Sequence, residues 1–194
     1  MGRTGKSQLD WINAGQALLI EGGINAVKLH RLTAAMGVST GSFYHHFRNF
    51  DAYLDELADY YGVEQVRRLF EQARALAGDE PEARLLKATA IFGRSSMRVL
   101  NIAMRSWAHD NPRARSAVER YDAALAQNLD DIFLSMGFDE LEAKSRTLIM
   151  LGLASVHFDP DMQPTMRERW HCIRSLIIPE SSLSSIHTRP AKAG

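Results

Sequence analysis

Residues 28–48 read KLHRLTAAMGVSTGSFYHHFR and carry the strongest structural signal in the chain. Apolar residues recur at helical spacing on both sides of Gly37, which predicts two short helices at about 28–36 and 40–46. Glycine allows the left-handed turn that joins such helices, and Ser39 stands where a side chain can cap the second one. The segment is therefore predicted to form a helix-turn-helix.

The second of these helices has two different faces. Phe43 and Phe47 turn inward at the helical period, whereas small polar, hydroxyl and aromatic residues turn outward. Small residues at the helix start let its backbone approach the base pairs in a major groove. An ordinary helix-loop-helix corner can show the same spacing, so the pattern alone leaves that alternative open.

Individual contacts with double-stranded DNA follow from the outer face. Ser42 and Tyr44 can donate hydrogen bonds to phosphate groups. Thr40 and His45 are placed to meet base edges or a thymine methyl group. The complete set of predicted DNA-binding residues is Lys28, His30, Ser39, Thr40, Gly41, Ser42, Tyr44, His45, His46 and Arg48.

Residues 11–47 read WINAGQALLIEGGINAVKLHRLTAAMGVSTGSFYHHF and resemble the DNA-binding region of TetR-family regulators, most closely in the run 37–47. The resemblance implies an all-helical body that dimerises and holds a pocket for an effector. It also implies phosphate binding by Ser42 and Tyr44, base contacts by Thr40, Gly41 and His45, and a position at the phosphate edge for His46.

Two departures from the family's pattern affect the expected contacts. The family often has Ser or Thr before the first motif helix, where this chain has Val27-Lys28, so we expect weaker capping there. Many relatives carry Lys or Arg at the start of the fourth helix, where this chain has Phe50. We expect Arg48 and the backbone amides of 49–51 to supply that phosphate contact.

The rest of the chain also shows the helical period between glycine and proline breakers, with no alternating stretch long enough for a strand, so we predict an all-α fold. The first helix should bury Trp11, Ile12, Gly15, Leu18 and Leu19. The helices outside the motif are expected at about 8–22, 49–77, 82–94, 96–109, 112–136, 139–158 and 164–178. The predicted domains are a three-helix DNA-binding domain at 1–48, a larger effector-binding and dimerisation domain at 49–179, and a disordered tail at 180–194.

Charge and composition limit the class of protein. The net charge of zero argues against a uniformly basic coat protein. Residues 1–50 hold five basic and two acidic residues, a net charge of +3, which suits phosphate contact at one end, although chance clustering explains it equally well. A single cysteine cannot form an internal disulfide, and no apolar run reaches the roughly 18 residues of a membrane span. We expect a cytoplasmic protein with no membrane partner.

Several sequence patterns could indicate catalysis or metal binding, but each has a simpler structural explanation. Gly5-Lys6-Ser7 resembles the end of a P-loop but lacks the first glycine and a preceding strand. His157, Asp159 and Asp161 could ligate a metal, yet acids beside a proline commonly cap the next helix. His171 and Cys172 are adjacent, and they are interpreted as packing residues rather than as a reactive thiol. We therefore predict no enzyme activity, no cofactor and no metal site.

Two features of the predicted body suggest further partners. A stripe of methionine and aromatic residues is a candidate pocket for a small apolar effector, although such a stripe is more often plain core. Its residues are Phe92, Met97, Met104, Trp107, Tyr121 and Met150. The helices at 139–158 and 164–178 carry more apolar surface than one core contact uses, which favours a homodimer through a four-helix bundle over simple closure of the monomer core.

These patterns together predict a sequence-specific DNA-binding transcriptional regulator, acting as a repressor that a small-molecule effector releases from a two-fold operator. An effector-independent or activating regulator is the alternative within the same class. A small all-helical enzyme or ligand carrier is the alternative from a different class, but the run 37–47 has no purpose in such a protein.

Overall fold

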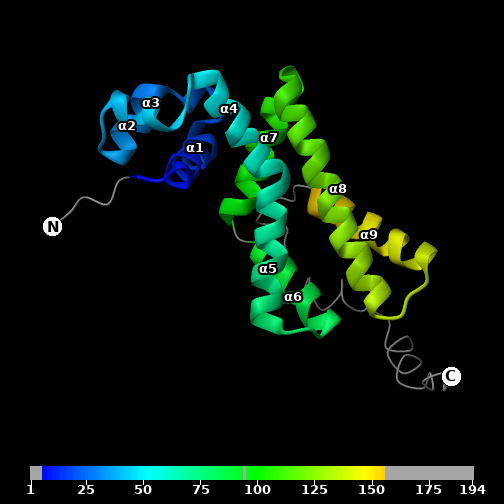
Figure 1. Ribbon diagram of the computed structural model, residues 1–194. Coiled ribbons are helices and arrows are strands. Elements are labelled where there is room, and N and C mark those ends of the chain that lie inside the picture. Colours follow the sequence, from blue (N-terminus) through cyan, green and yellow to red (C-terminus); the bar gives the residue numbers. More distant parts are fainter. Residues whose placement is uncertain (1–5, 94, 156–194) are drawn as a thin grey trace, which may run out of the picture. The chain divides into compact units, whose positions relative to one another are not determined.

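The computed structural model of the protein describes residues 6–93 and 95–155. Within these ranges the chain forms helices and no strand, which confirms the predicted all-α fold (Figure 1). The helices are α1 (Gln8–Gly22), α2 (Leu29–Met36), α3 (Thr40–His46), α4 (Phe50–Asp59), α5 (Gln65–Ala77), α6 (Pro81–Phe92), α7 (Ser95–Asp110), α8 (Pro112–Ser135) and α9 (Glu140–Ser155). A 3-10 turn, η1 (Ile24–Ala26), follows α1. Over the same residues, none of the helices combines the length and the apolar character needed to cross a membrane.

The helices begin and end close to the predicted residues because local caps define their ends. Ser7 and Asp10 form a reciprocal capping box at the start of α1. Pro81 occupies the first position of α6, where its missing N–H costs no helical hydrogen bond. The predicted helix at 164–178 and the predicted tail at 180–194 lie outside the described residues.

The single helix predicted at 49–77 is interrupted. A π-helical turn, η2 (Tyr60–Glu64), joins α4 to α5. Gly62 in this turn lies against the backbone of α8, so close that a β-carbon built on it would be 2.9 Å from the carbonyl oxygen of Ala117. A π turn accommodates one extra residue in a helix. The interruption thus occurs where α4 and α5 pass another helix at backbone distance.

The chain divides into two compact units, of which the first ends at Leu125 and the second begins at Ala126, both within α8. Residues 8–46, which form α1, α2 and α3 and are called the head below, share the first unit with α4 to α7. Packing of α1 against α7 ties the head to that unit. The functional division after residue 48 stays a prediction.

An aromatic core holds the head together and joins it to α4. Its members are the buried residues Trp11, Phe43, Phe47 and Tyr53. The rings of Trp11 and Phe43 meet edge to face with centroids 5.3 Å apart, and Phe43 lies 5.5 Å from Tyr53. The Tyr53 hydroxyl donates a buried hydrogen bond of 3.0 Å to the Trp11 carbonyl oxygen. The predicted buried face of the first helix is confirmed for Trp11, Ile12, Gly15, Leu18 and Leu19.

Candidate nucleic-acid interface

The turn between α2 and α3 has the predicted left-handed conformation. Gly37 has φ 65° and ψ 36°, and the Val38 N–H donates to the Thr33 carbonyl oxygen at 3.1 Å. This pattern closes α2 and sends the chain sharply into α3. Lys28 precedes α2 and gives it no side-chain cap, as its sequence led us to expect.

The predicted side-chain cap at Ser39 is wrong. Ser39 is the N-cap residue of α3 by its extended backbone, but its side chain makes no capping hydrogen bond. Its backbone carbonyl oxygen instead accepts from the Ser42 N–H at 3.0 Å, as in any first helical turn. Ser39 is exposed, so its hydroxyl remains on the surface of the motif.

The two faces of α3 are separated as the spacing predicted. Phe43 is buried in the aromatic core together with Phe47, directly after the helix. The outward side chain of Tyr44 is 53% exposed, and its ring packs edge to face on Phe43 with centroids 5.4 Å apart. This contact helps to orient the Tyr44 side chain. Exposed positions on the same helix are Thr40, Gly41 and His45, and Ser42 and His46 are half-buried.

A shallow depression runs between α2 and α3. It is lined by His30, Thr33, Ala34, Gly37, Val38, Ser39 and Ser42. Three of the predicted DNA-binding residues, His30, Ser39 and Ser42, therefore line one continuous surface. Small and hydroxyl-bearing side chains leave it open enough for a nucleic-acid backbone to approach.

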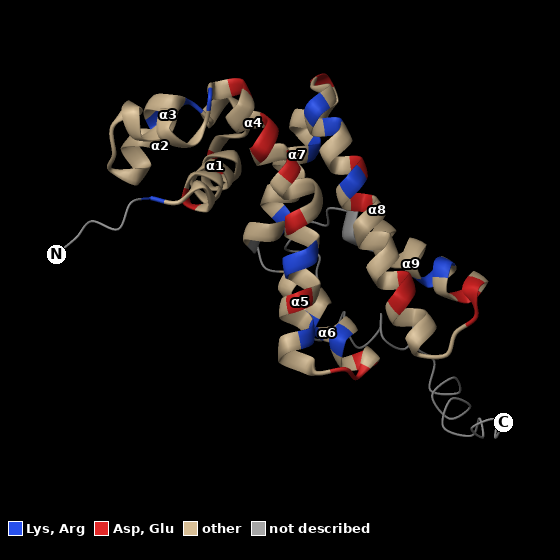
Figure 2. Ribbon diagram, in the orientation of Figure 1, with Lys and Arg blue, Asp and Glu red and all other residues tan. Residues whose placement is uncertain are grey.

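Cations near this surface are few (Figure 2). Lys28 and Arg48 are exposed, and no described residue forms an ion pair with either of them. Arg31, by contrast, donates to Glu21 at 2.7 Å and so connects α2 to α1. Arg48 and Lys28 are therefore the two cations of the motif that could neutralise phosphate without first breaking an ion pair in the described structure.

The start of α4 has a cap that the sequence analysis missed. Asn49 accepts the Ala52 N–H through its side-chain oxygen at 2.7 Å. Asparagine directly before a helix is a known capping signal, so the pattern was available in the sequence. Asp51 follows in the first turn and is exposed.

The predicted effector residues occupy different environments. Met104, Trp107 and Tyr121 are buried, whereas Phe92 and Met97 are half-buried and Met150 belongs to the second unit. Tyr121 stacks on Tyr61 with ring centroids 4.5 Å apart and an angle of 11° between the rings. Burial raises the pKa of Tyr121 to about 12, so its hydroxyl stays neutral.

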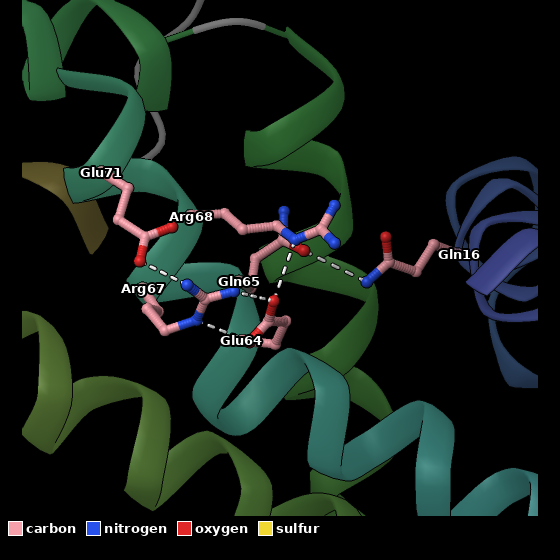
Figure 3. Close-up of polar contacts among 6 residues, drawn as sticks. All are labelled: Gln16, Glu64, Gln65, Arg67, Arg68 and Glu71. Atoms are coloured by element: carbon pink, nitrogen blue, oxygen red, sulfur yellow. Dashed lines mark hydrogen bonds and ion pairs between the residues drawn. The ribbon is translucent and has the colours of Figure 1, made fainter. Parts of the chain in front are cut away.

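A chain of polar contacts connects the head to the segment after η2 (Figure 3). The Gln16 amide of α1 donates to the Gln65 side-chain oxygen at 3.3 Å. The Gln65 amide in turn donates to the sulfur of Met97 on α7 at 3.0 Å. Beside them, Glu64 accepts from Arg67 and Arg68, and these hydrogen bonds lower its pKa to about 2. Met97, a predicted effector residue, is thus linked to the head through one intervening side chain, Gln65.

The helix predicted for dimerisation at 139–158 is α9, which has a large apolar outer surface within the second unit. Leu141 is 76% exposed, Leu148 is 71% exposed and Ile149 is 54% exposed. Gly152 on the same helix has no neighbouring atom within 4 Å of where a β-carbon would lie. Apolar surface of this kind favours a protein contact.

Comparison with known proteins places the motif in a family context. Residues 12–59 match the model of the family described as "Bacterial regulatory proteins, tetR family". No curated protein sequence matches the chain. The match covers most of α1 and all of α2, α3 and α4, and it includes every member of the aromatic core except Trp11.

Solved structures extend the similarity in fold to most of the chain. A TetR transcriptional regulator from Legionella pneumophila has a TM-score of 0.64 at 13% identity, with 96% of this chain and 95% of that chain covered. A transcriptional regulator from Rhodococcus sp. Rha1 has a TM-score of 0.60 at 17% identity, covering 93% and 92%. The multidrug binding protein EbrR, solved with imidazole, has a TM-score of 0.58 at 16% identity, covering 96% and 98%. At these identities the likeness shows a common fold.

Proposed function

We propose that this chain is a regulator of the TetR family: a repressor that binds a two-fold operator as a homodimer and leaves it when a small molecule binds. The match of residues 12–59 to the family model supports this proposal. The matched region is the DNA-binding part of such regulators, which supports a DNA-binding transcriptional regulator rather than an enzyme. We expect it to act in the cytoplasm, where its operator is found.

The outer face of α3 carries this proposal. Thr40 and Gly41 are exposed on it, and the buried Phe43 and Phe47 fix the orientation of the helix in the head. A rigid short helix with small residues at its start suits entry into a major groove. In this pose Thr40 and His45 contact base edges.

Phosphate contacts surround that face in the proposed complex. Ser42 and Tyr44 donate to the backbone from α3, with His46 at the edge of the contact, and Lys28 and Arg48 supply charge. His30, Ser39 and Gly41 complete the surface, since they lie in or beside the depression between α2 and α3.

The apolar face of α9 supports the homodimer. Leu141, Leu148 and Ile149 would be covered by the partner subunit. The helix that the sequence predicts at 164–178, outside the described residues, would complete a four-helix bundle. A two-fold dimer presents two heads to half-sites about 34–36 Å apart, or one turn of DNA.

An effector would act on the spacing of the heads. We propose that it binds among Phe92, Met97, Met104, Trp107 and Tyr121 of the first unit. Met150, the sixth predicted residue, belongs to the second unit. A neighbour in fold is described as a multidrug binding protein, which supports a small-molecule ligand. Release requires that the ligand bind the DNA-free conformation more tightly than the DNA-bound one. The contact of Met97 with Gln65, and of Gln65 with Gln16, offers a short route from that region to the head.

Selection of bound duplexes from a random DNA library tests the proposal. We expect an inverted repeat whose half-site centres are about one helical turn apart. Substitution of Thr40 or His45 should change the preferred base at one position of each half-site by roughly 1–3 kcal/mol. Recovery of no preferred sequence would reject operator binding. An unchanged preference in both variants would reject the proposed docking face.

A further inference from the structure

Three aspartates follow one face of α4 at intervals of four residues: Asp51, Asp55 and Asp59. This spacing places their side chains above one another on one side of a helix. Opposite them, the first half of α8 carries Arg113 and Arg120, within the same compact unit. The acidic residues of α4 and the basic residues of α8 are distinguished by colour in Figure 2.

Ion pairs join the two rows. The Arg113 Nε contacts the Asp55 carboxylate, and its Nη1 lies 3.9 Å from Asp51. The Arg120 Nη2 contacts Asp59. Two arginines thus hold three carboxylates of a helix that is separate in sequence, and we call these five residues the α4–α8 ladder.

The arginines are themselves held in direction by α8. The Arg120 Nη1 donates to the Ser116 hydroxyl oxygen at 2.8 Å, one turn earlier on the same helix. Arg113 has a side chain only 27% exposed. Partial burial limits the conformations of this side chain and weakens screening by solvent, so its pairs hold α4 more firmly than freely exposed ones would.

A close backbone contact lies just beyond the ladder. At η2, Gly62 approaches Ala117 so closely that a β-carbon would meet its carbonyl oxygen at 2.9 Å and its α-carbon at 3.1 Å. One such contact fixes a point of α4 and η2 against α8 but leaves the direction of α4 free to change. The ladder adds contacts along α4, and these restrict its direction.

The direction of α4 is passed on to the DNA-reading helix. Tyr53 on α4 packs against Phe43 of α3 with ring centroids 5.5 Å apart, and its hydroxyl donates to Trp11 of α1. Since these contacts are buried, the head moves with the start of α4, within the limits set by the packing of α1 against α7. A change of angle at the ladder would therefore displace the whole head.

We propose that Arg113 and Arg120 are positioning residues for operator binding: they hold α4 at the angle that sets each head for its half-site. This inference rests on the proposed function and deepens it, because it names the contacts that set the position of the head. Neither arginine contacts the DNA in this account. Each arginine affects operator binding only by holding α4 at its angle.

The test measures the affinity of the wild-type protein and of the double variant Arg113→Gln/Arg120→Gln for two DNA probes. One probe is the two-half-site operator obtained from the selection, and the other is a duplex with a single half-site. Exposed ion pairs have small energies, so we expect the operator affinity to fall by about threefold to tenfold. Affinity for the single half-site should stay unchanged, because each head remains folded.

Arg74→Gln is the matched control. It removes one positive charge, half of what the double variant removes, from an exposed pair, Arg74 with Asp79 at 2.6 Å, at the far end of α5. Amide hydrogen exchange in the DNA-free protein gives a second measurement. Exchange should accelerate in α4 of the double variant and remain unchanged in α4 of the control.

Charge exchange distinguishes positioning from general stability. Arg120→Asp alone should weaken operator binding, because it faces Asp59 with a like charge, and Arg120→Asp/Asp59→Arg should restore it. Equal loss of affinity for both DNA probes, or no loss for either, would overturn the inference. So would failure of the exchanged pair to restore binding in a protein with wild-type thermal stability.

The outcomes also separate this inference from the proposed function. If the wild-type protein binds an operator and the ladder variants bind it equally well, only the inference fails. If the wild-type protein selects no DNA, the proposed function fails, and the role of the arginines in DNA binding fails with it. Accelerated amide exchange in α4 would then show only that the ladder holds α4 against α8, with no role in DNA binding.

Discussion

Two attachments of α4 differ in their physical character. Toward the head, α4 is joined by the aromatic core, in which Phe43 and Tyr53 are completely buried. Toward α8, it is joined by ion pairs whose carboxylates are largely exposed: Asp51 is 83% and Asp59 is 69% exposed. Buried aromatic contacts resist separation, whereas exposed ion pairs are weak and replaceable by water. The head and the start of α4 should therefore move as one piece.

The largest effect is expected from the aromatic attachment. Phe43→Ala should lower the free energy of unfolding by about 3–5 kcal/mol, because it removes a buried ring and leaves a cavity. Urea unfolding followed by circular dichroism measures this. Tyr44→Ala, one residue away on the exposed face, is the control and should cost much less. Comparable losses in both variants would mean that the core does not hold the head as described.

A smaller effect is expected where η2 touches α8. Gly62→Ala places a methyl group 2.9 Å from the Ala117 carbonyl oxygen, and relief requires a shift of backbone. Overpacking of this kind costs about 1–3 kcal/mol, measurable by thermal unfolding. Gly41→Ala is the control, since the nearest atom, the Ser39 hydroxyl oxygen, is 3.6 Å away. Equal stability of Gly62→Ala and wild type would mean that Gly62 does not lie against the α8 backbone as described.

The contrast between the two glycine turns shows what the sequence could predict of the fold. Gly37 acts locally: the helical period ends there, and a left-handed residue is needed to turn the chain. Gly62 acts through Ala117, which belongs to a distant part of the chain. No local pattern contains that neighbour, so 49–77 was predicted as one uninterrupted helix.

In the candidate site too, local features were predictable from the sequence and contacts between distant segments were not. The inward and outward faces of α3 were predictable, because helical period alone separates Phe43 from Tyr44. The cap at Ser39 was predicted wrongly, since residue type gives the tendency to cap but not the rotamer. The pairing of Arg113 with Asp55 was beyond prediction, as it depends on how α8 packs against α4.

Substitution of Arg48 should weaken DNA contact without disturbing the attachment of α4 to the head or to α8. It is exposed and forms no ion pair in the described part of the chain, so Arg48→Ala should leave stability unchanged. Loss of one phosphate contact per head should lower the salt dependence of binding by about one unit in the log–log slope for each half-site. Titrations at several salt concentrations measure the slope, with Arg74→Gln as the charge control. An unchanged slope would remove Arg48 from the interface.

The smallest effect is expected from acid, which acts on the ion pairs near η2 and leaves the aromatic core unchanged. Hydrogen bonds from Arg67 and Arg68 lower the pKa of Glu64 from its usual 4.5 to about 2 in the folded protein. Because the folded pKa lies below the unfolded one, the stabilisation is present above about pH 4.5 and is lost as the pH falls toward 2.

Burial raises the pKa of Tyr53, which therefore stays neutral throughout this range. Glu64→Gln should remove part of the acid-induced loss of stability that wild type shows between about pH 5 and pH 2. The exposed Glu119, changed to Gln, is the control and should follow the wild-type curve. If Glu64→Gln and wild type lose stability in parallel across this range, the carboxylate of Glu64 is not held by its arginines in solution. The ion pairs beside η2 would then contribute nothing to the stability of the junction between η2 and α5.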